Sequence, residues 1–129
     1  DMGARFLITD MVRALKNQAV FKTSAENIVR DFITPPDFYK LIQSVIDYGA
    51  INTALDCYTK APVSKFDLLA ELDKLFGLEY CINKSVEIIN ATGGKLNYFS
   101  ENKKARVFGY HPKTTSIEGV IQELGFLGL

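Results

Sequence analysis

Helices with clear start and stop signals alternate with short strand-like runs along this sequence. The run Thr-Pro-Pro-Asp at 34–37 is typical of a helix start, and apolar residues then recur at helical spacing until Gly49. Ser64 is expected to cap a second helix, with Asp67 three residues on, and that helix is expected to end at Gly77. This alternation predicts an α/β fold, or an α+β fold when the chain is isolated.

Weaker signals predict the remaining elements. We expect a first amphipathic helix over 5–15, a short lysine-rich helix capped by Ser100 and a last helix capped by Ser116, which gives about five helices in all. The low charge of 50–57 predicts a strand that is buried on both faces. Further short strands are predicted at 28–33, 78–83 and 87–89, with a flexible break at 92–94.

Length and charge limit the classes of protein to which the chain can belong. It has 129 residues, enough for one domain with its own core, and its 15 Lys and Arg balance 15 Asp and Glu. This neutrality argues against nucleic acid or an anionic membrane as the main partner, because both require clustered positive charge. Cys57, Cys81 and a single histidine make a disulfide scaffold or a metal site improbable. Without a membrane span or a signal peptide, we expect a cytoplasmic protein.

Three local patterns could suggest chemistry, and each has a plainer explanation. Tyr-x-x-x-Lys at 80–84 can work as a general acid/base pair only when both side chains lie one helical turn apart, whereas here it falls in a predicted strand. His111 precedes a proline and is more typical of a turn than of a base or a metal ligand. The segment 92–95 lacks the spacing of a phosphate-binding loop. We therefore assign no catalytic, cofactor-binding or metal-binding residue.

Arg30 and Asp31 stand together in an otherwise apolar predicted strand. Since side chains alternate across a strand, one of the two should point inward, and an inward arginine requires an anionic partner. Two interpretations remain open for Arg30 from the residues alone. One is a salt bridge within the domain, and the other is binding of a phosphate group.

The order of these signals resembles the C-terminal portion of the extended short-chain dehydrogenase/reductases, the NAD-dependent epimerase/dehydratase family that acts on nucleotide sugars. The segment 29–33 is similar to the family's Arg-Asp-Phe/Tyr-Ile stretch, and 50–55 is similar to its Asn-x-Gly strand. The segment 102–114 resembles the family's Asp-x-Ser-Lys-Ala…Leu-Gly-(Tyr/Trp)-x-Pro-x-Thr tail and is the most specific match. The resemblance spans nearly the whole chain and implies part of a Rossmann-type enzyme.

The resemblance also implies which residues bind substrate. An arginine at the position of Arg30 contacts the nucleotide diphosphate in such enzymes, Arg5 could reach a phosphate or sugar, and Tyr98 is the third expected substrate contact. Two motifs depart from the family. The segment 91–94 lacks the usual Arg-x-Gly-Asp, and 52–54 lacks the usual glycine. A divergent member that acts on another sugar-like or small carbonyl substrate therefore remains a second possibility.

The glycine-rich dinucleotide loop and the helical Tyr-x-x-x-Lys of the family have no counterpart in residues 1–129. We therefore expect one C-terminal substrate-binding domain, inactive alone, whose NAD or NADP and dinucleotide-binding domain belong to a parent enzyme, an epimerase, dehydratase or reductase. The expected partners are that domain, a nucleotide sugar and further copies in a homo-oligomer. The alternative is a stand-alone, non-catalytic interaction or ligand-binding module. In the first case, the helix from Asp37 to Ile46 and the strand at 50–55 should normally pack on the dinucleotide-binding domain, so they should expose apolar surface in the isolated chain.

Overall fold

The computed structural model describes residues 6–83 and 96–129, and it confirms a mixed α/β fold. The helices in chain order are α1 (Leu7–Asn17), α2 (Pro35–Tyr48), α3 (Lys65–Phe76), a 3-10 helix η1 (Lys104–Phe108) and α4 (Ser116–Phe126). The strands are β1 (Phe21–Ser24), β2 (Val29–Arg30), β3 (Val63–Ser64), β4 (Tyr80–Asn83) and β5 (Asn97–Tyr98). In this part of the chain no helix is long and apolar enough to cross a bilayer.

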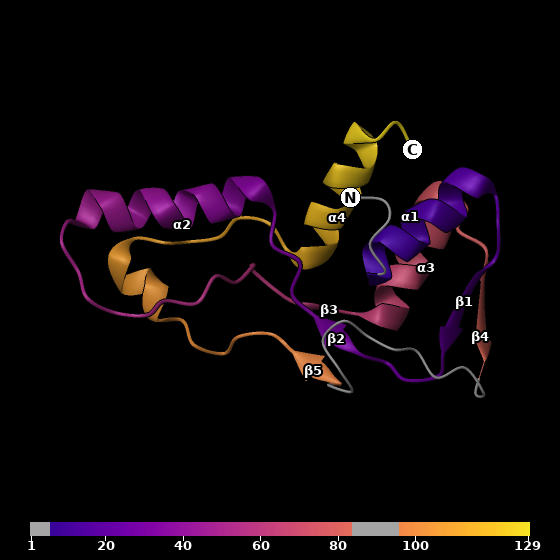
Figure 1. The fold of residues 1–129 in the computed structure, drawn as a ribbon, viewed down its shortest axis with the longest axis horizontal. Coiled ribbons are helices and arrows are strands. Elements are labelled where there is room, and N and C mark those ends of the chain that lie inside the picture. Colours follow the sequence, from indigo (N-terminus) through magenta and orange to yellow (C-terminus); the bar gives the residue numbers. More distant parts are fainter. Residues whose placement is uncertain (1–5, 84–95) are drawn as a thin grey trace.

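The strands form two small sheets. Strand β1 pairs with β4 in parallel, with Phe21 opposite Tyr80. Strand β2 lies between β3, to which it is antiparallel, and β5, to which it is parallel. Figure 1 shows α1 and α3 at one end of the molecule, beside β1 and β4, whereas α2 lies at the other end. Helix α4 and the three-stranded sheet lie in the middle of the view.

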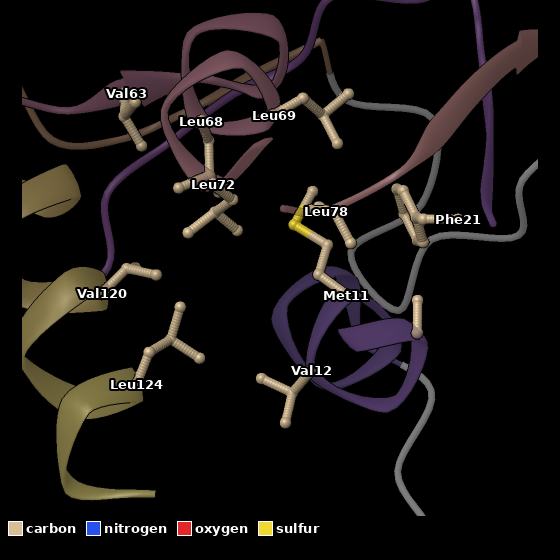
Figure 2. Close-up of a cluster of buried hydrophobic side chains, with 11 residues drawn as sticks. Met11, Val12, Phe21, Val63, Leu68, Leu69, Leu72, Leu78, Val120 and Leu124 are labelled. Atoms are coloured by element: carbon tan, nitrogen blue, oxygen red, sulfur yellow. The ribbon is translucent and has the colours of Figure 1, made fainter. Parts of the chain in front are cut away.

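The main core lies between α1, α3 and α4. Leucines at positions 68, 69 and 72 of α3 point into this core from one face of the helix, and their side chains are almost fully buried (Figure 2). Met11 and Val12 of α1 and Leu124 of α4 belong to the same cluster as these leucines. Each such leucine contributes about 1.5–3 kcal/mol through removal of its surface from water, so this cluster is the main source of stability.

A second, smaller cluster holds the other end of the molecule together. Leu41 of α2 and Ala105 of η1 are buried against Tyr58 and Tyr110. The two tyrosine rings meet edge to face with centroids 5.2 Å apart, and the Tyr110 hydroxyl donates a 2.7 Å hydrogen bond to the Tyr58 carbonyl. Burial raises the pKa of Tyr110, so its hydroxyl keeps its proton and serves as a donor.

Helix boundaries follow the sequence signals at two of the predicted starts. The Thr34 hydroxyl accepts a hydrogen bond from the Asp37 amide at the start of α2, and the Ser64 hydroxyl accepts one from the Asp67 amide at the start of α3. Helix α3 ends at Gly77, which adopts the left-handed conformation (φ 69°) that favours glycine. These parts of the prediction are confirmed.

Two predicted caps are wrong. Helix α4 is capped by Thr115, whose side chain accepts from the Glu118 amide, whereas Ser116 is its first helical residue and is fully buried. The lysine-rich segment forms only the 3-10 helix η1, and the Ser100 hydroxyl accepts a hydrogen bond from the Asn102 amide outside it. In both cases a hydroxyl that could serve as a cap is used for a different contact.

The strand predictions are mixed. The strand predicted at 78–83 is confirmed in β4, the strand predicted at 28–33 is reduced to two residues, and β1 was not among the predicted strands. The prediction of a strand at 50–57 is wrong, because this segment pairs with no strand among the described residues. The predicted burial on both faces is also wrong, because its residues alternate between half-buried and exposed positions. The predictions at 87–89 and 92–94 lie outside the described residues.

Helix α4 contains two glycines in contrasting surroundings. A Cβ added at Gly119 would lie 2.6 Å from the Thr34 methyl group, whereas one added at Gly125 would meet nothing within 4 Å. We expect Gly119→Ala to lower the free energy of unfolding by about 1–3 kcal/mol, since Thr34 is held as the cap of α2. Gly125→Ala should raise it by about 0.5–1 kcal/mol through helix propensity. Urea unfolding of both variants checks this, and equal effects would exclude a close approach of α4 to Thr34.

Candidate ligand-binding groove

A groove of about 520 Å³ opens beside the three-stranded sheet, between three segments that are far apart in sequence. The segment that follows β2 forms one wall, the extended segment before Tyr58 forms a second, and the end of β5 with its following residues forms the third. The lining residues are Asp31, Ile33, Leu55, Asp56, Cys57, Tyr98, Phe99 and Ser100. Two carboxylates, two aromatic rings, a hydroxyl and a thiol therefore meet at one place.

Asp31 is fixed by hydrogen bonds from two other parts of the chain. Its carboxylate accepts from the Thr59 amide (3.0 Å), from the Thr59 hydroxyl and from the Ser116 hydroxyl (2.7 Å). The Ser116 oxygen in turn accepts from the Phe32 amide at 2.8 Å. This network ties the segment after β2 to Thr59 and to the first turn of α4, so it sets the shape of one groove wall.

Asp56 and Ser100 meet from opposite walls. The Ser100 hydroxyl donates a 2.5 Å hydrogen bond to Asp56 Oδ2, and both side chains are accessible to solvent. Next to Asp56, the Cys57 thiol lies 3.6 Å from the Tyr110 hydroxyl. That hydroxyl donates its hydrogen to the Tyr58 carbonyl. Burial raises the pKa of the Cys57 thiol, so it stays protonated and is a poor nucleophile.

The aromatic side chains of Tyr98 and Phe99 supply the apolar surface of the groove. The Tyr98 side chain is 53% exposed and that of Phe99 is 39% exposed, although both are large and apolar. Rings that remain this accessible can pack against a planar or sugar ring of a ligand. The arrangement is suited to an amphipathic, ring-containing molecule.

The structure brings two of the three predicted substrate contacts together. Arg30 of β2 is the register partner of Tyr98 of β5. Of the Arg30 and Asp31 side chains, of which one was expected to point inward, it is Arg30 that does so. It is only 8% exposed and donates to the carbonyls of Val29 (2.8 Å) and Leu96 (3.1 Å). Burial lowers the pKa of its guanidinium group. Arg30 is not a lining residue of the groove, whereas Tyr98 is. Arg5, the third, lies outside the described residues.

Sequence reasoning missed Asp56, Phe99 and Ser100 as groove residues. Asp56 could have been noticed as the one acidic residue in the run 50–57, but nothing local indicated that Ser100 would face it. Tyr80 lies in β4, as the strand interpretation of 80–84 requires, and His111 is exposed outside any helix or strand. Within residues 6–83 and 96–129, no group of three His, Cys, Asp or Glu side chains could hold a metal ion.

Comparison with known proteins gives matches to solved structures alone. No family model matches the sequence, and no curated protein matches it. UDP-glucuronic acid 4-epimerase from Bacillus cereus, in complex with UDP-glucuronic acid and NAD, is similar with a TM-score of 0.77 and 16% identity, over 96% of this chain and 40% of that chain. MoeE5 in complex with UDP-glucose and NAD is similar with a TM-score of 0.75 and 17% identity, over 95% of this chain and 41% of that chain.

A third similar structure is the UDP-glucose 4-epimerase of Thermus thermophilus in complex with NAD, with a TM-score of 0.60 and 16% identity over 86% of this chain and 36% of that chain. The chain thus spans about two fifths of the length of the enzymes that it matches, or 40% of the first. At such low identity the similarity establishes the fold. This chain has the mixed α/β fold of the C-terminal part of Rossmann-type, NAD-dependent UDP-sugar epimerase structures.

Proposed function

We propose that this chain is the substrate-binding part of a cytoplasmic, NAD(P)-dependent enzyme that epimerises, dehydrates or reduces a nucleotide sugar. The observation that carries the proposal is the match of 96% of the chain to a UDP-sugar epimerase that was solved with its nucleotide sugar and NAD. On this proposal the chain contributes substrate contacts. NAD or NADP and the proton-transferring residues belong to a dinucleotide-binding part of the enzyme.

The groove supports this proposal through the chemistry of its walls. Tyr98 and Phe99 offer aromatic surface to a ring, while Asp56 and Ser100 offer an acceptor and a hydroxyl to the hydroxyl groups of a sugar or ribose. Arg30 lies one strand away from the groove, at the register position of Tyr98. A guanidinium group is well suited to a diphosphate because its planar donors match two phosphate oxygens. We assign Arg30, Tyr98 and Arg5 as the substrate contacts.

A second surface supports the need for a further part of the enzyme. Helix α2 exposes large apolar side chains, among them Phe38, Ile42 and Ile46, and Ile46 is 66% exposed. A shallow apolar groove of about 370 Å³ runs between α2 and Ile51 to Leu55. We call the exposed side of α2 together with residues 51–55 the α2 face. Such an accessible apolar face indicates a surface that a partner covers.

The backbone next to the α2 face indicates what kind of partner covers it. Among the described residues, no amide or carbonyl of 51–57 bonds to another backbone group, although the alternating burial of this segment is that of a strand. An extended segment with open backbone groups is a template for pairing with the edge of a sheet. We propose that the dinucleotide-binding part supplies that sheet and packs beneath α2. This is the contact predicted from the sequence for the α2 region and the strand at 50–55.

Binding of a nucleotide sugar tests the proposed substrate role. We expect UDP-glucose to bind the chain and Tyr98→Ala to weaken that binding about tenfold, because ring stacking contributes about 0.5–1.5 kcal/mol beyond the area that it buries. Isothermal titration calorimetry measures both affinities. Tyr80→Ala is the matched control, since Tyr80 is also an accessible tyrosine on a short strand but lies in β4, outside the groove. Equal losses in the two variants, or no binding at all, would refute the substrate role.

A further inference from the structure

The groove carries negative charge on two of its walls. Asp31 and Asp56 both line it, and none of the described lining residues is positively charged. The three ion pairs in the described part of the chain involve other carboxylates. One lysine ammonium lies next to a groove residue: Lys103 Nζ is 2.9 Å from the Ser100 carbonyl and 3.9 Å from the centre of the Tyr58 ring. The negative charge of the groove is therefore not neutralised by an ion pair there.

The two carboxylates differ in what they can offer a ligand. Three hydrogen bonds from the chain occupy both oxygens of Asp31, so its position is fixed and its charge acts only through space. At Asp56 the Ser100 hydroxyl engages Oδ2, whereas Oδ1 accepts no hydrogen bond from the described residues. Asp56 Oδ1 is thus an available acceptor in the lining of a groove that also holds the rings of Tyr98 and Phe99.

We propose that Asp56 is a specificity-determining residue that makes this groove select a hydroxyl-bearing, uncharged sugar ring and reject a sugar that carries a carboxylate. The reasoning rests on the proposed function, since it takes a nucleotide sugar as the ligand. An open carboxylate oxygen accepts hydrogen bonds from sugar hydroxyls. A uronate would instead place a third negative charge beside Asp56 and Asp31, and like charges at contact distance near a protein surface repel strongly.

Solved structures of similar fold contain either an uncharged sugar or a sugar that carries a carboxylate. Proteins of this fold can therefore bind either kind, and discrimination between the two must come from individual residues. The Bacillus cereus UDP-glucuronic acid 4-epimerase was solved with UDP-glucuronic acid, and MoeE5 was solved with UDP-glucuronic acid and, separately, with UDP-glucose. The two ligands share the uridine diphosphate and differ at one carbon of the sugar. A comparison of their affinities therefore isolates the effect of the sugar's charge.

The test is a titration of the chain with UDP-glucose and with UDP-glucuronic acid, followed by calorimetry or by NMR shift changes. We expect UDP-glucose to bind about tenfold more tightly, a ratio that corresponds to about 1.4 kcal/mol. In Asp56→Asn the ratio should fall towards one, mainly because UDP-glucuronic acid binds better. Asp73→Asn, an exposed carboxylate on α3, is the control for net charge and should leave the ratio unchanged.

The outcomes separate this inference from the proposed function. If both ligands bind and the ratio is near one, or if Asp56→Asn leaves the ratio unchanged, the role of Asp56 is overturned while nucleotide-sugar binding stands. If neither ligand binds, the proposed function fails and the inference fails with it. Circular dichroism of Asp56→Asn confirms that the variant is folded, which we expect because Asp56 is exposed.

Discussion

Replacing Asp31 with alanine should lower the free energy of unfolding by about 3 kcal/mol, because hydrogen bonds to a charged group contribute about 1.5–3 kcal/mol and several are lost together. The carboxylate accepts from the Thr59 amide, the Thr59 hydroxyl and the Ser116 hydroxyl. Thr59 and Ser116 are almost completely buried, so water does not easily replace the lost acceptor. Urea unfolding followed by circular dichroism measures the change.

Two further variants test whether the lost hydrogen bonds cause the lower free energy of unfolding of Asp31→Ala. Asp31→Asn keeps the shape and one acceptor oxygen, so its destabilisation should fall between those of the wild type and Asp31→Ala. Asp73→Ala removes an exposed carboxylate and should change the free energy by less than about 0.5 kcal/mol. A value for Asp31→Ala as small as that of Asp73→Ala would show that the network does not hold β2, Thr59 and α4 together.

The second large effect is expected on association in solution. The isolated chain should self-associate through the α2 face, and the double variant Ile42→Asp with Ile46→Asp should remain monomeric. Both isoleucines are accessible on α2, and a buried apolar contact cannot tolerate unpaired carboxylates. Sedimentation velocity over about a hundredfold range of concentration detects the change, because association depends on concentration by mass action.

The control for this experiment is Leu75→Asp on α3. Leu75 is also an accessible apolar residue, but it lies outside the α2 face, so this variant should associate like the wild type. If the wild-type chain is monomeric throughout, the α2 face does not need a partner. A stand-alone binding module would then be the better account of the chain than part of a larger enzyme.

The reliable sequence signals were the ones that act within a few residues. Pro35 and Thr34 start α2, Ser64 starts α3, and Gly77 ends α3 in the left-handed conformation that a glycine adopts without strain. The mixed α/β fold follows from these boundaries, and the fold of the solved structures agrees with it. Of the site, the sequence indicated that one of Arg30 and Asp31 points inward and, through a family resemblance, that Arg30 and Tyr98 belong to the substrate contacts.

The failures share a different cause, which is that they depend on groups far away in the sequence. Ser116 has the chemistry of a cap, but its hydroxyl donates to Asp31, 85 residues away, so Thr115 takes the cap of α4. The segment 50–57 has the composition of a strand, but a strand also needs a neighbour with open backbone groups. None of the described strands pairs with 50–57, so this segment has no strand partner in the described part of the chain.

The sequence by itself determined where α2 and α3 begin, where α3 ends, which helix face is apolar and that one of Arg30 and Asp31 would point inward. These properties depend on backbone conformation and on side chains within one or two turns of each other. The tertiary structure alone decided that Asp56 and Ser100, 44 residues apart, would share a hydrogen bond across a groove, and that Arg30 would stand beside Tyr98. Such contacts depend on how segments far apart in the sequence pack around the sheet, and a pattern of neighbouring residues does not predict that packing.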